Sequence, residues 1–214
     1  MTIEAGESIK TIKNPDGSVT KRVMDVVVSF LLLVILAPFF LLIALAVKLT
    51  SRGPVFYRWN VLGKDGREIK SYKFRSMVNN ADKLKDELSS NNEMTGPVFK
   101  MKNDPRITRF GSFIRKFSID ELPQFYSVLL GELSMVGPRP PSRAEYDNFE
   151  PWQRRKTSIK PGITCLWQVN GRNKISNFED WVKLDLNYID NWSIGLDISI
   201  LLRTVVTVLK GTGE

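Results

Sequence analysis

The stretch VVVSFLLLVILAPFFLLIALAVKLT, residues 26–50, is almost entirely apolar, and it decides how this protein is built. As a straight helix, residues 26–47 would rise about 33 Å, which is close to the thickness of the hydrocarbon core of a bilayer. Pro38 lies near its middle and has no backbone N–H to bond the carbonyl of Val34, so the helix should bend or break there. The length therefore permits two structures, a kinked transmembrane span and a re-entrant hairpin of two short arms.

The charges that flank this segment discriminate between the two structures. Lys21 and Arg22 precede it, and Lys48 and Arg52 follow it. Because Lys and Arg collect on the cytoplasmic side of membrane segments, basic residues at both ends favour the re-entrant hairpin. Asp25 lies four residues after Lys21, which predicts an ion pair between them near the interface. A core helix of a soluble protein is disfavoured, because the segment is apolar all round.

The composition narrows the chemistry of the rest of the chain. The 214 residues carry 31 Lys and Arg against 23 Asp and Glu, a net charge of +8, which predicts an anionic partner. The chain has no histidine and one cysteine, Cys165, which excludes Ser-His-Asp and Cys-His catalysis, ordinary zinc sites and internal disulfides. Phosphate-binding loops of the Walker and Rossmann types are absent, as are a D-x-D pair and nucleic-acid motifs, so no nucleic acid is expected as a partner.

Turn signals after the apolar segment predict a small mixed α+β domain that is mainly helical. Strands are expected at 55–59 and 69–74, joined by a turn at Lys64-Asp65-Gly66 into a hairpin. Helices are expected at 79–89, 110–117, 122–133, 143–157, 177–191 and 194–209. The last of these is apolar but carries Asp197 and Arg203, which predicts an amphipathic helix lying on a bilayer. The alternative for the tail is a core helix.

Two adjacent acids in RKFSIDELPQ, residues 115–124, form the strongest candidate for a reactive centre. Ser118 and Glu121 match a capping box, but Pro123 would then fall at the fifth helical position and remove a hydrogen bond. With Asp120 near the N-cap, Pro123 lies in the first turn, and the positive helix end keeps both carboxylates ionised. The pattern leaves three roles open for Asp120: a cap, a metal ligand or a nucleophile.

Basic residues beside glycine and proline turns form the second candidate feature. Arginines on rigid turns suit the bidentate binding of phosphate, whereas the alternative is ordinary solvated surface charge. The residues in question are Lys73, Arg75, Arg109, Arg115, Arg139 and Arg172.

Seven motifs together make the chain resemble a known family. They are KRVMD before the apolar segment, GPVFYRW, YKFRSM, TRFGSFIRKFSIDELPQ, MVGPRPP, KPGITCLWQVNGRN and LDLNYIDNWS. The sequence resembles the bacterial sugar transferases, which are monotopic polyprenyl-phosphate phosphoglycosyl transferases, from about residue 21 to 210. It is similar to the catalytic domain of undecaprenyl-phosphate hexose phosphotransferases.

The resemblance implies an activity and roles for individual residues. The activity is transfer of a sugar-1-phosphate from a UDP-sugar to undecaprenyl phosphate with release of UMP. Asp120 would be the nucleophile of the Asp120-Glu121 dyad, and both carboxylates are candidate neighbours of a Mg²⁺ ion. The substrate-binding residues implied by the match are Lys73, Arg115, Arg139, Arg172 and Asp185. Many members have Ser-Pro at the membrane break, where this chain has Ala37-Pro38.

The resemblance also implies an organisation and a place in the cell. It divides the chain into a polar lead-in (1–20), a re-entrant helix-break-helix (21–50), a catalytic domain (51–193) and an amphipathic helix and tail (194–214). The protein would sit on the cytoplasmic face of the bacterial inner membrane. Besides the two substrates and the bilayer, a homodimer partner and downstream glycosyltransferases are compatible with it. Two alternatives remain, a catalytically silent membrane-surface scaffold of the same shape and a membrane-tethered binder of acidic polymers.

Overall fold

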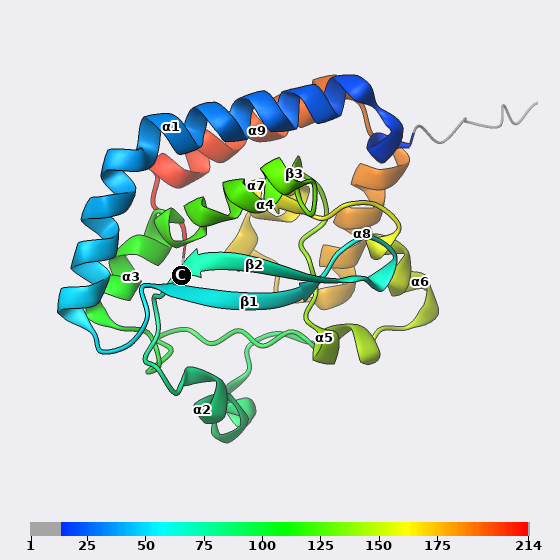
Figure 1. Cartoon of the computed structure of the whole chain (residues 1–214). Helices are drawn as coiled ribbons and strands as arrows, with labels where there is room; N and C mark the ends of the chain where they lie inside the picture. The colour runs from blue at the N-terminus through cyan, green and yellow to red at the C-terminus, as the bar shows by residue number, and fades with distance from the viewer. Residues whose placement is uncertain (1–13, 214) are drawn as a thin grey trace, which may run out of the picture.

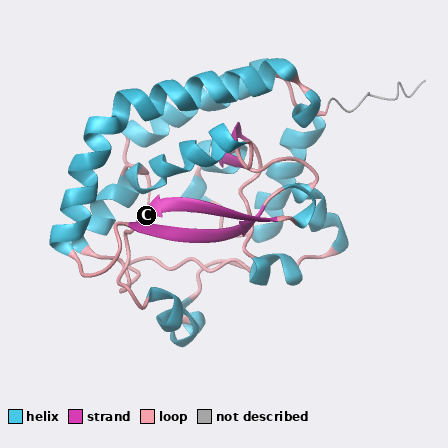
Figure 2. Cartoon of the chain, in the orientation of Figure 1, coloured by secondary structure: helices cyan, strands magenta, loops and turns pink. Residues whose placement is uncertain are grey.

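The computed structural model describes residues 14–213, apart from the side chain of Asn173, so most of the polar lead-in lies outside the described residues. Within this range helices dominate, and the strands form two small sheets (Figure 2), which confirms the predicted mixed, mainly helical class. The α-helices are α1 Val19–Thr50, α2 Ala81–Glu87, α3 Arg109–Lys116, α4 Phe125–Leu130, α5 Arg143–Asp147, α6 Pro151–Arg154, α7 Leu166–Val169, α8 Phe178–Asp190 and α9 Ile194–Leu209. The strands are β1 Phe56–Leu62, β2 Glu68–Phe74, β3 Ser134–Val136 and β4 Gly162–Thr164. Short 3₁₀ helices are η1 Pro15–Gly17, η2 Lys64–Gly66, η3 Ser89–Asn91, η4 Ile119–Gln124, η5 Arg155–Thr157 and η6 Arg172–Lys174.

The long apolar segment forms one helix, α1, that stays helical through Pro38. The predicted break into two helices is therefore wrong. Figure 1 shows that α1 instead changes direction, running along one edge of the molecule and then down its side. A bend suffices because the missing N–H of proline costs one hydrogen bond, and the helix can resume after it. By length and composition α1 is able to cross a membrane, and little of its apolar surface is buried within the protein.

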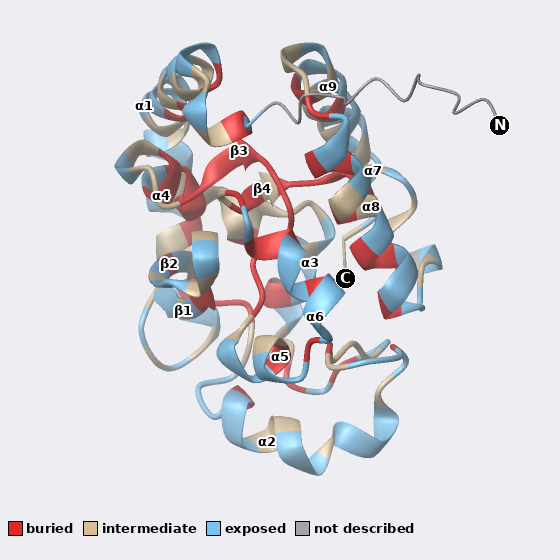
Figure 3. Ribbon diagram, turned by 90° about the vertical axis from the view of Figure 1, so that its right-hand side faces the viewer, coloured by how far each residue is buried: buried red, intermediate tan, exposed pale blue. Residues whose placement is uncertain are grey.

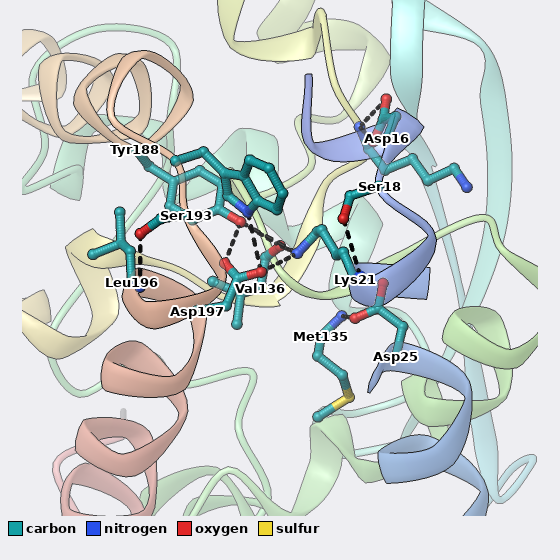
Figure 4. Close-up of polar contacts among 12 residues, drawn as sticks. Asp16, Ser18, Lys21, Asp25, Met135, Val136, Tyr188, Ser193, Leu196 and Asp197 are labelled. Atoms are coloured by element: carbon teal, nitrogen blue, oxygen red, sulfur yellow. Dashed lines mark hydrogen bonds and ion pairs between the residues drawn. The ribbon is translucent and has the colours of Figure 1, made fainter. Parts of the chain in front are cut away.

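A buried polar cluster fixes the N-terminal end of α1 to the core (Figure 4). Lys21 Nζ lies 2.8 Å from Asp197 Oδ2 and donates to the carbonyl oxygen of Val136 at 3.0 Å. Asp25 accepts a hydrogen bond from the backbone N–H of Met135 at 3.0 Å. The predicted Lys21–Asp25 ion pair is thus replaced by a Lys21–Asp197 pair. Helices α1 and α9 both pack on β3, which brings the buried carboxylate of Asp197 within reach of the lysine.

Helix α9 has two unlike faces. Asp197 and Ile200 are 0% exposed and face the core, whereas the opposite face exposes the apolar side chains of Ile198, Leu202, Val205, Val206 and Leu209. The predicted amphipathic helix is confirmed, and its inner face also serves as part of the core. Figures 1 and 3 show α9 and the first part of α1 along the same edge of the molecule, and in Figure 3 they stand apart with β3 between and below them. Much of the exposed apolar surface of the described residues belongs to these two helices.

The predicted hairpin is confirmed as β1 and β2, which pair antiparallel from Phe56–Phe74 to Leu62–Glu68. Its turn contains Asp65 and Gly66 at φ 55° and 73°. This left-handed backbone conformation is one that Asp, Asn and Gly tolerate better than other residues. The second sheet, β3 beside β4 in parallel, was not predicted, because three-residue strands carry no periodic signal. This second sheet fixes the positions of two turns, one after β3 and one after β4, beneath α1 and α9.

Two predicted helices are shorter than expected. The helix of residues 122–133 begins as the 3₁₀ helix η4 and becomes α-helical only at Phe125. The helix of residues 143–157 is divided into α5, α6 and η5. Pro151 causes this division, because a proline disfavours the helical conformation in the preceding residue, and Glu150 is extended at ψ 156°.

Candidate active site

A cavity of about 550 Å³ opens between the β1–β2 hairpin, η4 and the segments that follow β3 and β4. It brings together six of the predicted site residues from four separate stretches of sequence. These are Lys73, Arg115, Asp120, Glu121, Arg139 and Arg172. Apart from the two acids, every one of them is a cation, so the cavity suits a ligand with several negative charges.

The two acids lie in the first turn of η4, after a sharp change in chain direction. Ser118 precedes η4 in the left-handed conformation at φ 51°, and its side chain makes no capping hydrogen bond. The capping box is therefore absent, as expected, but the predicted register is wrong, because Pro123 does lie at the fifth position of the helix. The 3₁₀ helix ends one residue later, so few backbone hydrogen bonds depend on the N–H that Pro123 lacks.

The dyad combines two carboxyl groups of unlike acidity. Burial and the neighbouring Glu121 raise the pKa of Asp120 to about 6. Burial would also raise the pKa of Glu121, but Lys73 and Arg172 outweigh it and lower that pKa to about 2. Lys73 Nζ lies 2.7 Å from Glu121 Oε1 and forms an ion pair with it. For Asp120 burial outweighs the helix end and raises the pKa, but a carboxyl with a pKa of about 6 is still mainly ionised at neutral pH.

Aromatic faces hold two of the cations in place. Lys73 Nζ lies 3.9 Å from the ring centroid of Trp59, and the Arg139 guanidinium lies 5.7 Å from the same ring. Arg139 is also 5.3 Å from the ring of Trp181. Cation–π contacts of this kind restrict the side chains without neutralising them. Trp59 and Trp181 are thus functional candidates that sequence reasoning missed, although Trp59 ends the quoted motif GPVFYRW.

Arg172 connects the acid-bearing turn to the loop after α7. Its Nη1 donates to Ser118 Oγ at 3.2 Å, and its backbone has φ 22°. Such a conformation is strained for a residue with a side chain, and it is typical of functional positions held by their surroundings.

Asp185 does not line the cavity. It is 1% exposed, and its Oδ2 lies 2.7 Å from Nζ of Lys156, which is 3% exposed. This buried pair lies behind the wall that Trp181 forms, and Lys156 is 5.2 Å from the ring of Trp181. The structure therefore places Asp185 behind the cavity wall, where it pairs with the lysine that packs on Trp181.

Asp120 and Glu121 are the only adjacent carboxylates in the cavity lining. Among residues 14–213 no group of three or more His, Cys, Asp or Glu side chains could enclose a metal ion. The pair of carboxylates matches the one or two that Mg²⁺ commonly takes from a protein, its shell being completed by water and substrate phosphates.

Comparison with known proteins agrees with this geometry. A sequence model of the family described as Bacterial sugar transferase matches residues 17–211. The chain is 53% identical over 161 residues to galactosyl transferase CpsE of Streptococcus agalactiae, covering 75% of this chain and 36% of that protein. It is 37% identical over 204 residues to the exopolysaccharide production protein ExoY of Sinorhizobium fredii, covering 94% of this chain and 90% of that protein.

A third relative is an undecaprenyl-phosphate galactose phosphotransferase of Salmonella typhimurium. It is 42% identical over 198 residues, which cover 90% of this chain and 41% of that protein. The chain thus spans less than half the length of CpsE and of the Salmonella protein, but nearly the whole of ExoY. On the extent of the family match and of these similarities, the chain belongs to the bacterial sugar transferases, a family of transferase enzymes.

Proposed function

We propose that the protein transfers a sugar-1-phosphate from a UDP-sugar to undecaprenyl phosphate and releases UMP, as an early membrane step of polysaccharide or glycoconjugate synthesis. One observation carries the proposal: a buried carboxylate, Asp120, lines the same cavity as the four predicted cations Lys73, Arg115, Arg139 and Arg172. The names of relatives supply the two substrates, since one is an undecaprenyl-phosphate galactose phosphotransferase and another a UDP-glucose:undecaprenyl-phosphate glucose-1-phosphate transferase. Galactose and glucose are therefore the first sugars to test.

In the proposed mechanism Asp120 is the nucleophile. One of its carboxylate oxygens attacks the β-phosphorus of the UDP-sugar, the bond to the bridging oxygen breaks, and UMP leaves with that oxygen. A phosphate oxygen of the lipid then attacks the same phosphorus, the bond to Asp120 breaks, and the sugar diphospholipid is released. Since its pKa is about 6, Asp120 is mainly ionised at neutral pH and needs no general base. This accounts for a site without histidine.

The neighbouring cations stabilise the charge that builds up on the phosphates. Arg172 and Arg139 are placed to bind non-bridging oxygens, and Lys73 stays oriented by Glu121 and Trp59. Asp120 and Glu121 would hold Mg²⁺ together with the substrate phosphates. The ion would offset the charge of the pyrophosphate and of the departing UMP.

We also propose the re-entrant arrangement of α1, on the cytoplasmic face of the inner membrane. At its N-terminal end Arg22 donates to the carbonyls of Val128 and Leu129, both at 2.7 Å. Just after the C-terminal end of α1, the backbone carbonyl of Ser51 accepts a hydrogen bond from Arg75 Nη2 at 2.8 Å. Because both ends contact the same small globular part, they lie on one side of a bilayer, which supports a bent helix that enters and leaves by the same face. A kinked span would separate them.

The alternative of a silent scaffold lacks a comparable observation. A buried carboxylate with a raised pKa destabilises a folded protein, and a scaffold gains nothing from it. The binder of acidic polymers likewise has no use for a buried nucleophile at the wall of this cavity.

The decisive experiment measures UMP release by purified protein in detergent with Mg²⁺, undecaprenyl phosphate and a panel of UDP-sugars. Asp120→Asn is assayed beside it, with Asp180→Asn on the exposed face of α8 as the matched control. Release with at least one sugar, lost only in Asp120→Asn, supports the proposal. Without the lipid acceptor, mass spectrometry of the protein should find a phosphosugar on Asp120. Folded protein that releases no UMP with any sugar would favour the scaffold.

A further inference from the structure

A second cavity of about 680 Å³ lies between the loop after α7 and the C-terminal end of α9. It adjoins the first cavity, because Gln168 and Arg172 line both. We propose that this second cavity receives the phosphate headgroup of the lipid acceptor. The inference rests on the proposed function and assigns a separate entrance to one of its two substrates.

The charge of the second cavity is the first argument. Four cations line it, namely Arg172, Lys174, Arg203 and Lys210, and none of its described lining residues is an Asp or Glu. Arg203 is oriented by hydrogen bonds from Nη2 to the carbonyl of Val169, at 3.0 Å, and to the side chain of Asn170. A site with several cations and no counter-charge favours a phosphate over a neutral or zwitterionic ligand.

The apolar rim is the second argument. Val206 lines the cavity and is also 50% exposed on the apolar face of α9, beside Leu202, Val205 and Leu209. The basic cavity therefore adjoins the exposed apolar face of α9. Helix α9 runs along the same edge of the molecule as the first part of α1 (Figures 1 and 3). A ligand that fits both surfaces has an anionic head and an apolar tail. The UDP-sugar has no apolar tail, which leaves the lipid phosphate as the ligand of this entrance.

The connection to the reacting carboxylate is the third argument. Arg172 lines both cavities, and it donates to Ser118, which precedes the dyad by two residues. A phosphate held by Lys174 and Lys210 would thus pass from these lysines to Arg172 as it approaches Asp120. The donor would occupy the first cavity, near Trp59 and Lys73, in the preceding half-reaction and leave it as UMP. The lipid phosphate would then approach the phosphosugar on Asp120 through the second cavity.

The test compares two double variants with equal loss of charge. Lys174→Gln/Lys210→Gln alters the proposed entrance, whereas Lys83→Gln/Lys183→Gln removes two exposed lysines that line neither cavity. Loss of two charge-assisted contacts should raise the KM for undecaprenyl phosphate about tenfold in the first variant only. The KM for the UDP-sugar and the rate of phosphosugar formation without acceptor should stay unchanged. An unchanged acceptor KM, or an equal loss in the half-reaction with the donor, would overturn the proposal.

A binding measurement separates this proposal from the proposed function. Native mass spectrometry of the detergent-purified protein counts bound undecaprenyl phosphate, undecaprenol or phosphatidylglycerol, each added at the same concentration. Wild-type protein should retain undecaprenyl phosphate and not undecaprenol, and the Lys174/Lys210 variant should lose most of that retention. Equal retention of phosphatidylglycerol would identify a general site for anionic lipids and overturn the assignment to the acceptor. This result stands even if the wild-type protein releases no UMP.

Discussion

Replacing the proposed nucleophile should make the protein more stable while it abolishes activity. Asp120 is 6% exposed, and its pKa rises from 3.8 to about 6 on folding. Each unit corresponds to about 1.4 kcal/mol, so the ionised carboxylate costs the folded state about 3 kcal/mol at neutral pH. Asp120→Asn keeps the shape and removes the charge. Its free energy of unfolding should therefore rise by about 3 kcal/mol, or roughly 6–12 °C in Tm for a chain of this size.

The gain in the free energy of unfolding from Asp120→Asn should be larger at high pH than at low pH. Because the folded-state pKa is raised, the folded protein binds more protons than the unfolded chain between pH 3.8 and about 6. Wild-type protein recovers stability as the pH falls through about 6, and below 3.8 the carboxyl is protonated in both states. The advantage of Asp120→Asn should thus be full above pH 6 and should vanish as the pH approaches 3.8.

Thermal unfolding in detergent, followed by tryptophan fluorescence at pH values on either side of 6, measures this difference. Asp180→Asn, at an exposed acid, serves as the control and should change Tm little at any pH. The reasoning is refuted if Asp120→Asn is as stable as wild type, or less stable, above pH 6. In that case favourable contacts stabilise the ionised Asp120 carboxylate in the folded protein by at least as much as its burial destabilises it.

Three further predictions concern other parts of the molecule. UMP release by wild-type protein should fall about tenfold per pH unit below the Asp120 pKa of about 6, and a flat pH–rate profile would contradict a carboxylate nucleophile. Pro38→Ala should straighten α1 and lower activity; unchanged accessibility of cysteines placed at both flanks, with full activity, would contradict this. Lys21→Met leaves Asp197 buried without its cation and should lower the free energy of unfolding by about 3–5 kcal/mol. A loss below about 1 kcal/mol would mean that the hydrogen bonds from Tyr188 and Trp192 are enough to stabilise the buried Asp197 carboxylate.

The sequence by itself determined the features that depend on a few neighbouring residues. The apolar run of α1, the β1–β2 hairpin and its turn, and the amphipathic α9 all follow from periodicity and turn chemistry. Six of the residues that line the active cavity were also identified beforehand, because basic residues near turns and a paired carboxylate motif are visible in the chain.

The tertiary structure alone decided which groups meet and how deeply they are buried. Lys21 pairs with Asp197, 176 residues away, although Asp25 is its neighbour on the helix. The acidity of Asp120 likewise depends on burial by distant segments, and the second basic cavity exists only where the end of α9 meets the loop after α7. Local sequence fixes backbone preference and charge, whereas solvation and pairing energies depend on contacts between segments that only packing brings together.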